Sequence, residues 1–344
     1  MFAKKNLVAA AALLALAGAA QAQVKLYGMV DMSVGSFENA HAKGTDARVT
    51  AVESGKMMTS YFGLSGSEDL GGGLKAEFVL ESFIGADTGG NVKNMADGFW
   101  SRGSFVALSG GFGKLAVGQY DNPLFASGYL YNPFGSSMQF SPTMRHYYAL
   151  NTTGGTPAAG SALGFDTGFV NSLTYETPNM GGFMATLQYS PKESTASTSK
   201  NSYAAAVNYT AGPLSAQLTY VKGGIATAYL DDQKVWSLGA SYDFGVAKAF
   251  GQYTDSDSTT NAREDKMYQI GVSVPLSDKA SVMASYGQLK REPNAGASSK
   301  DKVLSLGYGY ALSKRTDVYG VFTNNTATGL ESGQTFAVGV RHNF

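Results

Sequence analysis

The chain has 344 residues with 26 basic and 26 acidic side chains, and it contains no cysteine. This balance leaves no electrostatic footprint for nucleic acid, and the absence of cysteine excludes disulfides. The slightly negative mean hydropathy excludes a bundle of membrane-spanning helices. Many glycines and aromatic residues with only 9 prolines favour numerous strands joined by tight turns.

Residues 1–22 have the features of a secretory signal. Lys4 and Lys5 form a basic start, an apolar run covers 7–17, and 20–22 read as a small-x-small cleavage site. The alternative is a transmembrane helix, but the run is shorter than the roughly 20 residues that such a helix needs. The sequence therefore predicts a cleaved signal peptide, 1–22, followed by a barrel domain, 23–344.

From residue 24 onward, apolar side chains alternate with small or polar ones in segments of about ten residues. The first segment runs from Val24 to Val34 and the last from Gln334 to Phe344. This period of two is typical of a strand between lipid and water. We count sixteen segments, although the phase of 246–254 and of 316–324 is ambiguous. The pattern predicts an all-β, sixteen-stranded antiparallel transmembrane β-barrel.

The connections between these segments alternate between short turns and long polar loops. The short turns are expected at 68–73, 110–113, 177–182, 211–213, 245, 275–278 and 313–315. The long loops are expected at 36–57, 85–98, 121–167, 191–200, 222–232, 255–265, 291–301 and 325–333. Such asymmetry predicts that both termini lie on the short-turn side, which is periplasmic in an outer membrane. A barrel of this size encloses water.

A large soluble β-sandwich would also show alternating strands. Two features argue against it: the small face is too polar for a second core, and aromatic residues gather near segment ends, as in the girdles of membrane barrels. These aromatic residues are Tyr189, Tyr209, Tyr220, Tyr242, Phe244, Tyr310 and Phe344.

Five stretches carry a resemblance to a known family: Val24–Gly28, Phe62–Ala76, Ser104–Leu108, Tyr310–Thr316 and Val338–Phe344. With them, the whole chain resembles the general porins of Gram-negative bacteria, and more closely those of β-proteobacteria. The resemblance implies a homotrimer in the outer membrane, surrounded by lipid and lipopolysaccharide. It also implies passive diffusion of ions and small hydrophilic solutes, without a reaction or a cofactor. Phe344 would be the signal for the barrel-assembly machinery.

The family's long third loop folds into the lumen and sets the constriction, and 121–167 corresponds to it. Burial stabilises an aromatic side chain by about 1.5–3 kcal/mol, so we expect the loop's aromatic residues to pack inward. Among these, Tyr129, Tyr131 and Phe134 are candidates for the constriction. The alternative is a loop that caps a neighbouring subunit.

At several positions of the wall, this chain lacks a basic residue that the family has. Where relatives carry basic residues, this chain has Tyr61, Ser65, Gln119 and Gly168, whereas Arg102 matches a family arginine. Because a basic ring selects anions, its loss predicts weak charge selectivity. The residues predicted to line the pore, besides the three loop aromatics, are Arg102, Lys75, Glu77, Asp31, Tyr61, Asp121 and Arg145.

Two other functions remain open. An aromatic, hydroxyl-rich constriction would suit a substrate-specific channel with a saturable site for a sugar or an aromatic acid. A surface protein with a closed lumen, whose loops bind host or phage partners, is the second alternative. No metal site is expected, since His41, His146 and His342 are scattered.

Overall fold

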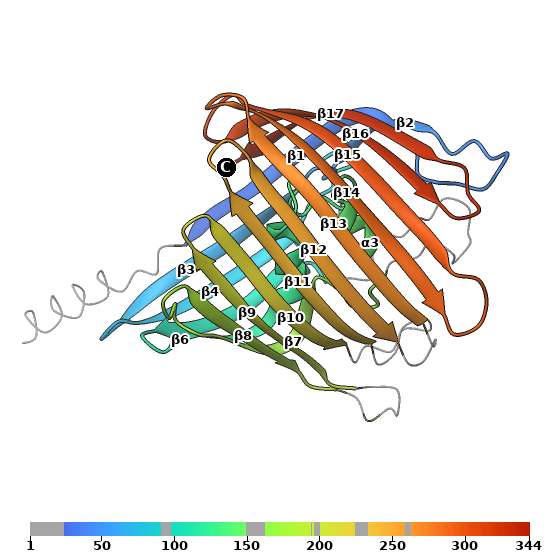
Figure 1. Cartoon of the computed structure of the whole chain (residues 1–344). Coiled ribbons are helices and arrows are strands. Elements are labelled where there is room, and N and C mark those ends of the chain that lie inside the picture. The colour runs from blue at the N-terminus through green and yellow to red at the C-terminus, as the bar shows by residue number, and fades with distance from the viewer. Residues whose placement is uncertain are drawn as a thin grey trace, which may run out of the picture.

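The computed structural model describes residues 24–90, 98–148, 162–193, 195, 200–223, 233–258 and 263–344. The predicted signal peptide, 1–22, lies outside these residues. One antiparallel sheet closes on itself, because β1 (Lys25–Phe37) pairs with β17 (Gly333–Asn343) (Figure 1). Among the described residues, no helix has both the length and the apolar character needed to cross a membrane.

The strands follow one another around the wall in chain order. Between β1 and β17 they are β2 (Val49–Ser54), β3 (Tyr61–Gly71), β4 (Leu74–Phe83), β5 (Gly103–Gly110), β6 (Gly113–Asp121), β7 (Gly168–Glu176), β8 (Phe183–Ser190), β9 (Ser202–Ala211), β10 (Leu214–Gly223), β11 (Gln233–Asp243), β12 (Lys248–Ser258), β13 (Arg263–Pro275), β14 (Ala280–Pro293), β15 (Ser299–Ala311) and β16 (Thr316–Ala327).

β2 and β3 share one position in the wall. The second half of β1, from Met32, pairs with β2, and its first half, up to Met29, pairs with β3. The wall therefore has the sixteen positions that the sequence predicts. The expectation that 36–57 is entirely loop is wrong, because β2 lies within it. β1 continues to Phe37, and the main-chain groups along its free edge form antiparallel hydrogen bonds with β2.

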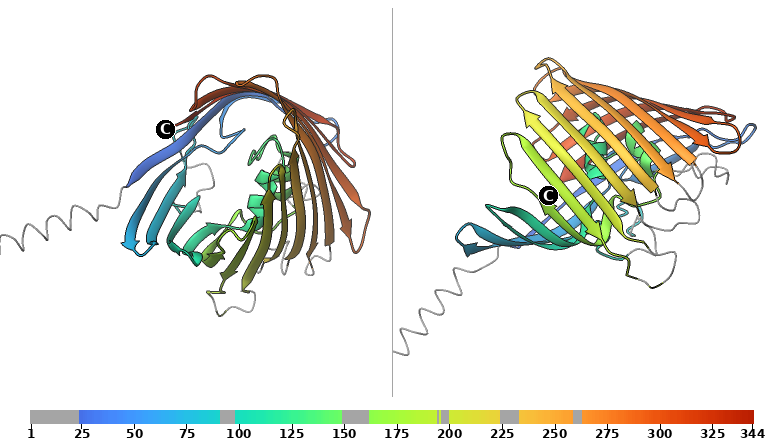
Figure 2. Two further views of the ribbon diagram at one scale, coloured as in Figure 1. Left: turned by 60° about the vertical axis from the view of Figure 1, so that its left-hand side comes forward. Right: turned by 60° about the horizontal axis from the view of Figure 1, so that its bottom comes forward.

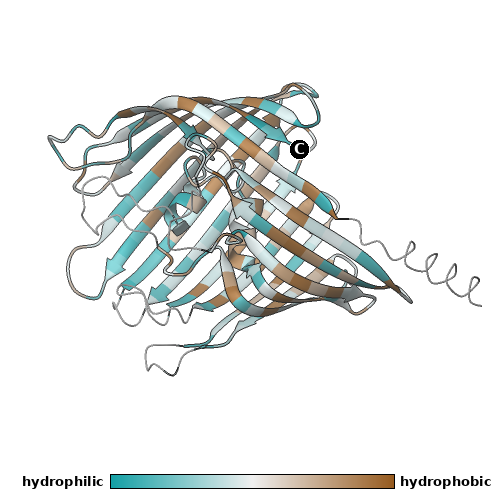
Figure 3. Ribbon diagram, turned by 180° about the vertical axis from the view of Figure 1, so that it is seen from behind, coloured by the Kyte–Doolittle hydropathy of each residue, from teal (hydrophilic) through white to brown (hydrophobic). Residues whose placement is uncertain are grey.

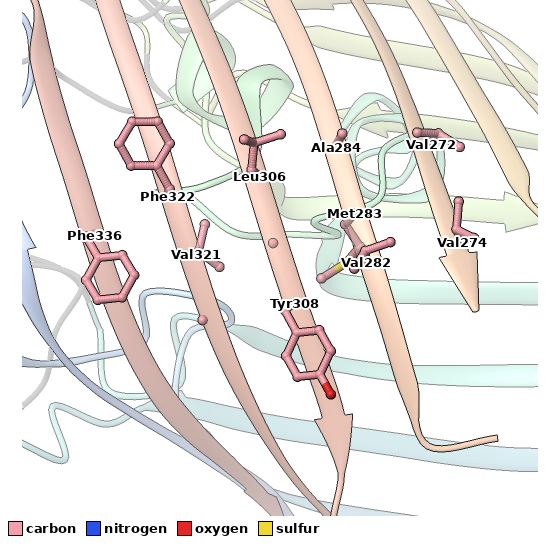
Figure 4. A pocket seen from close by; sticks show the side chains of 12 residues that line it. Val272, Val274, Val282, Met283, Ala284, Leu306, Tyr308, Val321, Phe322 and Phe336 are labelled. Atoms are coloured by element: carbon pink, nitrogen blue, oxygen red, sulfur yellow. The ribbon is translucent and has the colours of Figure 1, made fainter. Parts of the chain in front are cut away.

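Alternation along each strand separates the two faces as predicted. In β11, Trp236 and Leu238 are 54% and 55% exposed, whereas Val235 and Ser237 are buried. Bands of hydrophobic residues cross the strands in Figure 3. In Figure 4, Leu306 and Phe322 stand beside an apolar hollow on the outer surface over β13–β17. The apolar outer face meets lipid and the inner face carries the polar side chains.

Several strands extend further than the alternation predicts. β12 continues to Ser258, β14 to Pro293 and β15 starts at Ser299, all within expected loops. The hydrogen-bonded ladders persist beyond the part of each strand that meets lipid, and there the side chains no longer need to alternate in polarity. The seven short turns lie where they were predicted.

The last residue closes the seam between the first and last strands. The Phe344 N–H donates to the Gly28 carbonyl at 3.1 Å, and the Gly28 N–H donates to the Phe344 carbonyl at 3.3 Å. A methyl group at Gly28 would come within 2.6 Å of the Phe344 ring. Glycine at this position therefore lets the terminal ring lie against β1.

In the described part of the segment after β6 there are two short helices. They are α2 (Pro123–Leu130) and α3 (Pro142–Tyr148), and Figure 2 shows them enclosed by the strands. Asn122 caps α2: its side chain accepts from the N–H groups of Leu124 and Phe125, both at 3.0 Å. α2 contacts β9–β11 and α3 contacts β13–β15.

Candidate functional site

Glycines on the inner face of the wall leave space for side chains of the helical segment, the described part of loop 121–167 that contains α2 and α3. A methyl group at Gly239 would overlap the Tyr131 ring, so only glycine admits that ring against β11. The same relation, with distances of 2.5–2.8 Å, holds for Gly223 with Phe165, Gly271 with Pro133, Gly287 with Pro142 and Gly307 with Phe134. The rings of the loop thus fill gaps that the wall leaves open.

Polar side chains of the wall form hydrogen bonds with the same segment. Gln217 donates to the Pro123 carbonyl at 2.7 Å, and Ser305 donates to the Phe140 carbonyl at 2.7 Å. The Tyr131 hydroxyl lies 3.1 Å from the hydroxyl of Ser215. Because these bonds reach main-chain carbonyls as well as side chains, they fix the path of the loop and not only its contacts.

Arg102 lies in a compact group of charges and rings. Its Nη1 donates to the Glu81 carboxylate, and its guanidinium carbon lies 3.7 Å from the centroid of the Tyr61 ring. The Tyr27 hydroxyl donates to the other oxygen of Glu81 at 2.6 Å. The positive charge of Arg102 is therefore compensated locally by a carboxylate and by the face of an aromatic ring.

Register explains why these side chains meet. Tyr27 pairs with Gly63, Gly63 with Glu81, and Glu81 with Gly103, in one row across β1, β3, β4 and β5. A methyl group at Gly63 would come within 2.8 Å of Glu81 and 2.9 Å of Tyr27. The glycine between them leaves the space in which Tyr27 reaches Glu81.

An irregularity between β6 and β7 shapes the adjoining wall. The pairing shifts between Gly118 and Tyr120, where Gly118 has φ +133°. Such a bulge re-aims side chains next to a site. The Tyr120 hydroxyl donates to Glu176 at 3.0 Å, and Lys114 lies 5.3 Å from the centroid of the Tyr120 ring. The carboxylate thus contacts the hydroxyl of this tyrosine, and the lysine lies near its ring.

Among the residues that the structure describes, Arg102 and Asp121 line two cavities inside the barrel. One, of about 440 Å³, also includes Tyr27, Glu81 and Glu176. The other, of about 310 Å³, lies between the helical segment and the wall. Its remaining lining residues are Thr59, Phe83, Phe125, Ser136, Met138, Tyr148, Asp166 and Thr167. Arg102 and Asp121 therefore stand where the two cavities adjoin.

The structure brings together only part of the predicted pore set. Arg102, Tyr61 and Asp121 lie in this region, together with Tyr129, which lines the larger cavity. Burial, with the carboxylates of Asp121 and Glu176, raises the pKa of Tyr129 and keeps its hydroxyl neutral. Tyr131 and Phe134 are 1% and 3% exposed, and both pack against glycines of the wall.

The other predicted charges lie elsewhere. Asp31 is fully buried and accepts from the N–H groups of Met57 and Met58, at 2.7 and 2.9 Å, between β2 and β3. Lys75 is exposed near the short-turn end of β4. Glu77 lies 3.7 Å from Lys114.

Arg145 is buried in α3. It donates to Asn39 at 2.9 Å and to the Gln139 carbonyl at 3.2 Å. Burial lowers the pKa of the Arg145 guanidinium below its ordinary value, and the charge of Asp301 opposes this shift. Arg145 also donates to Asn325 of β16 at 3.4 Å and therefore holds the loop against the wall.

Sequence reasoning did not select Tyr27 or Tyr120 as site residues. The signal for Tyr27 was available, because it alternates inward on the first strand, but its partner Glu81 depends on the register across Gly63. Tyr120 follows a bulge, where alternation no longer gives the direction of a side chain.

A closed barrel with an apolar outside and polar, charged cavities inside is a transmembrane channel. The family model described as Gram-negative porin matches residues 9–330. The chain belongs to this family. It is therefore a channel of the outer membrane that acts by passive diffusion, and it is not an enzyme.

Individual relatives agree with this assignment. Outer membrane porin protein 32 of Delftia acidovorans is 36% identical, over 98% of this chain and 95% of the relative. An outer membrane porin protein of Bordetella pertussis is 31% identical, over 99% of this chain and 100% of the relative. A solved structure described as an anion-selective porin from Comamonas acidovorans has a TM-score of 0.76 at 31% identity, covering 94% of this chain and 100% of that chain.

Proposed function

We propose that this porin is a general diffusion channel with weak charge selectivity, in which loop 121–167 narrows the lumen. The pairing of Arg102 with Glu81 carries the proposal, because a paired cation focuses little field along the passage. Lys114 near Glu77 and Arg341 near Asp317, at 3.7 and 2.9 Å, extend the same arrangement around the wall.

Among the predicted charges, Arg102 and Asp121 are the ones we assign to the narrow region. Both line the two adjoining cavities. We leave Arg145 and Asp31 out of the charge set because they are buried and bonded to the chain itself. Lys75 acts at the short-turn mouth of the channel, and Glu77 lies deeper in the wall of the same strand.

The solved Comamonas porin is described as anion-selective. We infer a weaker preference here, because Tyr61 and Gln119 stand where the related family commonly has basic residues. Tyr61 contributes a ring face to Arg102, and Gln119 donates its amide to the Ser101 carbonyl. Neither side chain adds positive charge to the passage.

The reversal potential across a planar bilayer with a KCl gradient tests this proposal. Arg102→Ala should shift it toward cation preference, and Tyr61→Arg should shift it toward anions. Both shifts should be larger at low salt, since charges are screened within about 8–10 Å at physiological ionic strength. Strong anion selectivity of the unmodified channel, or no shift with Arg102→Ala, would refute the proposed charge arrangement.

We further propose that residues 1–22 are removed on export and that the mature barrel, 23–344, assembles as a homotrimer among lipid and lipopolysaccharide. The resemblance to trimeric porins supports the trimer, and the exposed apolar face of β13–β17 suits either lipid or a neighbouring subunit. Crosslinking of the detergent-purified protein should give a trimer band.

A substrate-specific channel is the second candidate function. One observation favours it: the smaller cavity is lined by the rings of Phe125 and Tyr148, whose centroids lie 6.0 Å apart. With such a site, block of the KCl current should rise with solute concentration to a plateau, whereas a channel without the site should show no plateau.

A further inference from the structure

We propose that the smaller cavity binds a zwitterionic amino acid with an apolar side chain, held with its carboxylate toward Arg102 and its ammonium toward Asp121 and Asp166. This inference rests on the proposed function, because the solute must reach the cavity through an open lumen. The channel would then favour such solutes over others of equal size.

Charges of both signs line this one cavity. Arg102 enters from the wall, while Asp121 ends β6 and Asp166 belongs to the returning end of the loop. A guanidinium has five N–H donors, and the bond to Glu81 uses Nη1, so Arg102 keeps donors for a carboxylate. A solute with one negative and one positive group matches this lining, whereas a simple ion matches only half of it.

Asp121 and Asp166 are held near each other at the neck of the loop, where 121–122 and 166–167 are joined by hydrogen bonds. The Asn122 N–H donates to the Thr167 carbonyl at 2.9 Å, and the Asn122 side chain donates to the Asp166 carbonyl at 2.7 Å. Both Asp121 and Asp166 lie close enough to raise the pKa of Tyr148 further than burial alone does. Asp121 and Asp166 thus both line the cavity beside Tyr148, and Oδ1 of Asp166 also accepts from the Thr167 N–H at 2.7 Å.

The remaining lining combines apolar surface with the hydroxyl groups of Thr59, Ser136 and Thr167. Phe125 packs edge-to-face against Tyr148, and Phe83 and Met138 complete the surface. A volume of about 310 Å³ is at the lower end of the range for small-molecule sites, about 300–1,000 Å³. An amino acid with a hydrocarbon or phenyl side chain has both the size and the division into a charged and an apolar half that this cavity offers.

Block of the KCl current through single channels by four solutes tests the inference. L-phenylalanine carries every required group, phenethylamine lacks the carboxylate, 3-phenylpropionate lacks the ammonium, and glycine lacks the side chain. L-phenylalanine should block saturably. Phenethylamine and 3-phenylpropionate should each block at least about tenfold more weakly, because each loses one charge-assisted hydrogen bond. Glycine should also block about tenfold more weakly, because it lacks the apolar surface that would pack against Phe125. This series uses the unmodified channel and does not depend on any variant folding.

Two variants then locate the site. Asp166→Asn should weaken block by L-phenylalanine and phenethylamine about tenfold and leave 3-phenylpropionate unchanged. Phe125→Ala should weaken all three phenyl solutes and leave glycine unchanged. Glu264→Gln is the matched control, because it removes the same charge from the outward-facing side of β13.

The outcomes separate the two proposals. Equal block by all four solutes, or no block by L-phenylalanine in a channel that conducts, would overturn the amino-acid site and leave the diffusion channel intact. Loss of block with Glu264→Gln as large as with Asp166→Asn would also overturn it. Absence of any current would refute the diffusion channel itself.

Discussion

Single side chains of the wall were predictable where alternation holds. Arg102 and Tyr61 were selected because strand phase and family resemblance point them inward, and they lie together. Strand phase also selected Asp31, and Arg145 was selected as one of the few charges of loop 121–167. Both are inside the barrel but form hydrogen bonds with the chain itself. Phase gives the face of a side chain, but it does not say whether a loop covers that face.

Asp31→Asn should lower the stability of the barrel. Asp31 accepts from Met57, Met58 and the Tyr319 hydroxyl, which lies 2.8 Å away, and an amide can replace only part of these bonds. A donor left unpaired in a buried site costs about 1–3 kcal/mol, so the midpoint of urea unfolding in detergent should fall. Asp278→Asn, in an exposed turn, is the control. Equal midpoints for the two variants would contradict this role.

The helical segment was predictable in part. Its many aromatic residues indicated burial, and Tyr131 and Phe134 are buried. The positions where these rings pack on the wall were not predictable. Gly239 and Gly307 are distant in sequence and meet the rings only through the register of β11 and β15. Nor did alternation reveal β2, which forms because the free edge of β1 binds it.

Asn122→Ala should loosen this segment. The side chain caps α2 and also donates to the Asp166 carbonyl, so its loss removes a cap worth about 1 kcal/mol and a tie across the neck. Current noise in single-channel records should increase while the mean conductance stays similar. Asn201→Ala removes a comparable side chain that accepts from Lys192 in another loop, and its records should match those of the unmodified channel. Identical noise in all three proteins would argue against a restraining role for Asn122.

The whole barrel followed from two patterns in the sequence. Sixteen alternating segments gave the number of wall positions, and the alternation of short and long connections gave the antiparallel order. Strand ends were misjudged where ladders continue beyond lipid contact, as at Ser258 and Ser299. The contacts inside the lumen could not be predicted in the same way, because they depend on which residues of neighbouring strands are in register.

Deletion of Phe344 should reduce the amount of folded protein in the outer membrane. The residue supplies two main-chain hydrogen bonds to Gly28 at the closing seam, and the family resemblance makes it the assembly signal. The molecules that do insert should have an unchanged conductance, because the ring lies on the outer face. Phe344→Trp keeps a terminal aromatic residue and should restore most of the yield. A normal yield after deletion would show that assembly does not depend on this residue.

The most direct test of an open, water-filled lumen is the conductance of single channels as the KCl concentration rises. If ions cross through water, the conductance of the purified protein should increase nearly in proportion to the KCl concentration. It should deviate upward only at low salt, where the few wall charges are least screened. A folded barrel that inserts into the bilayer and carries no current would contradict the account.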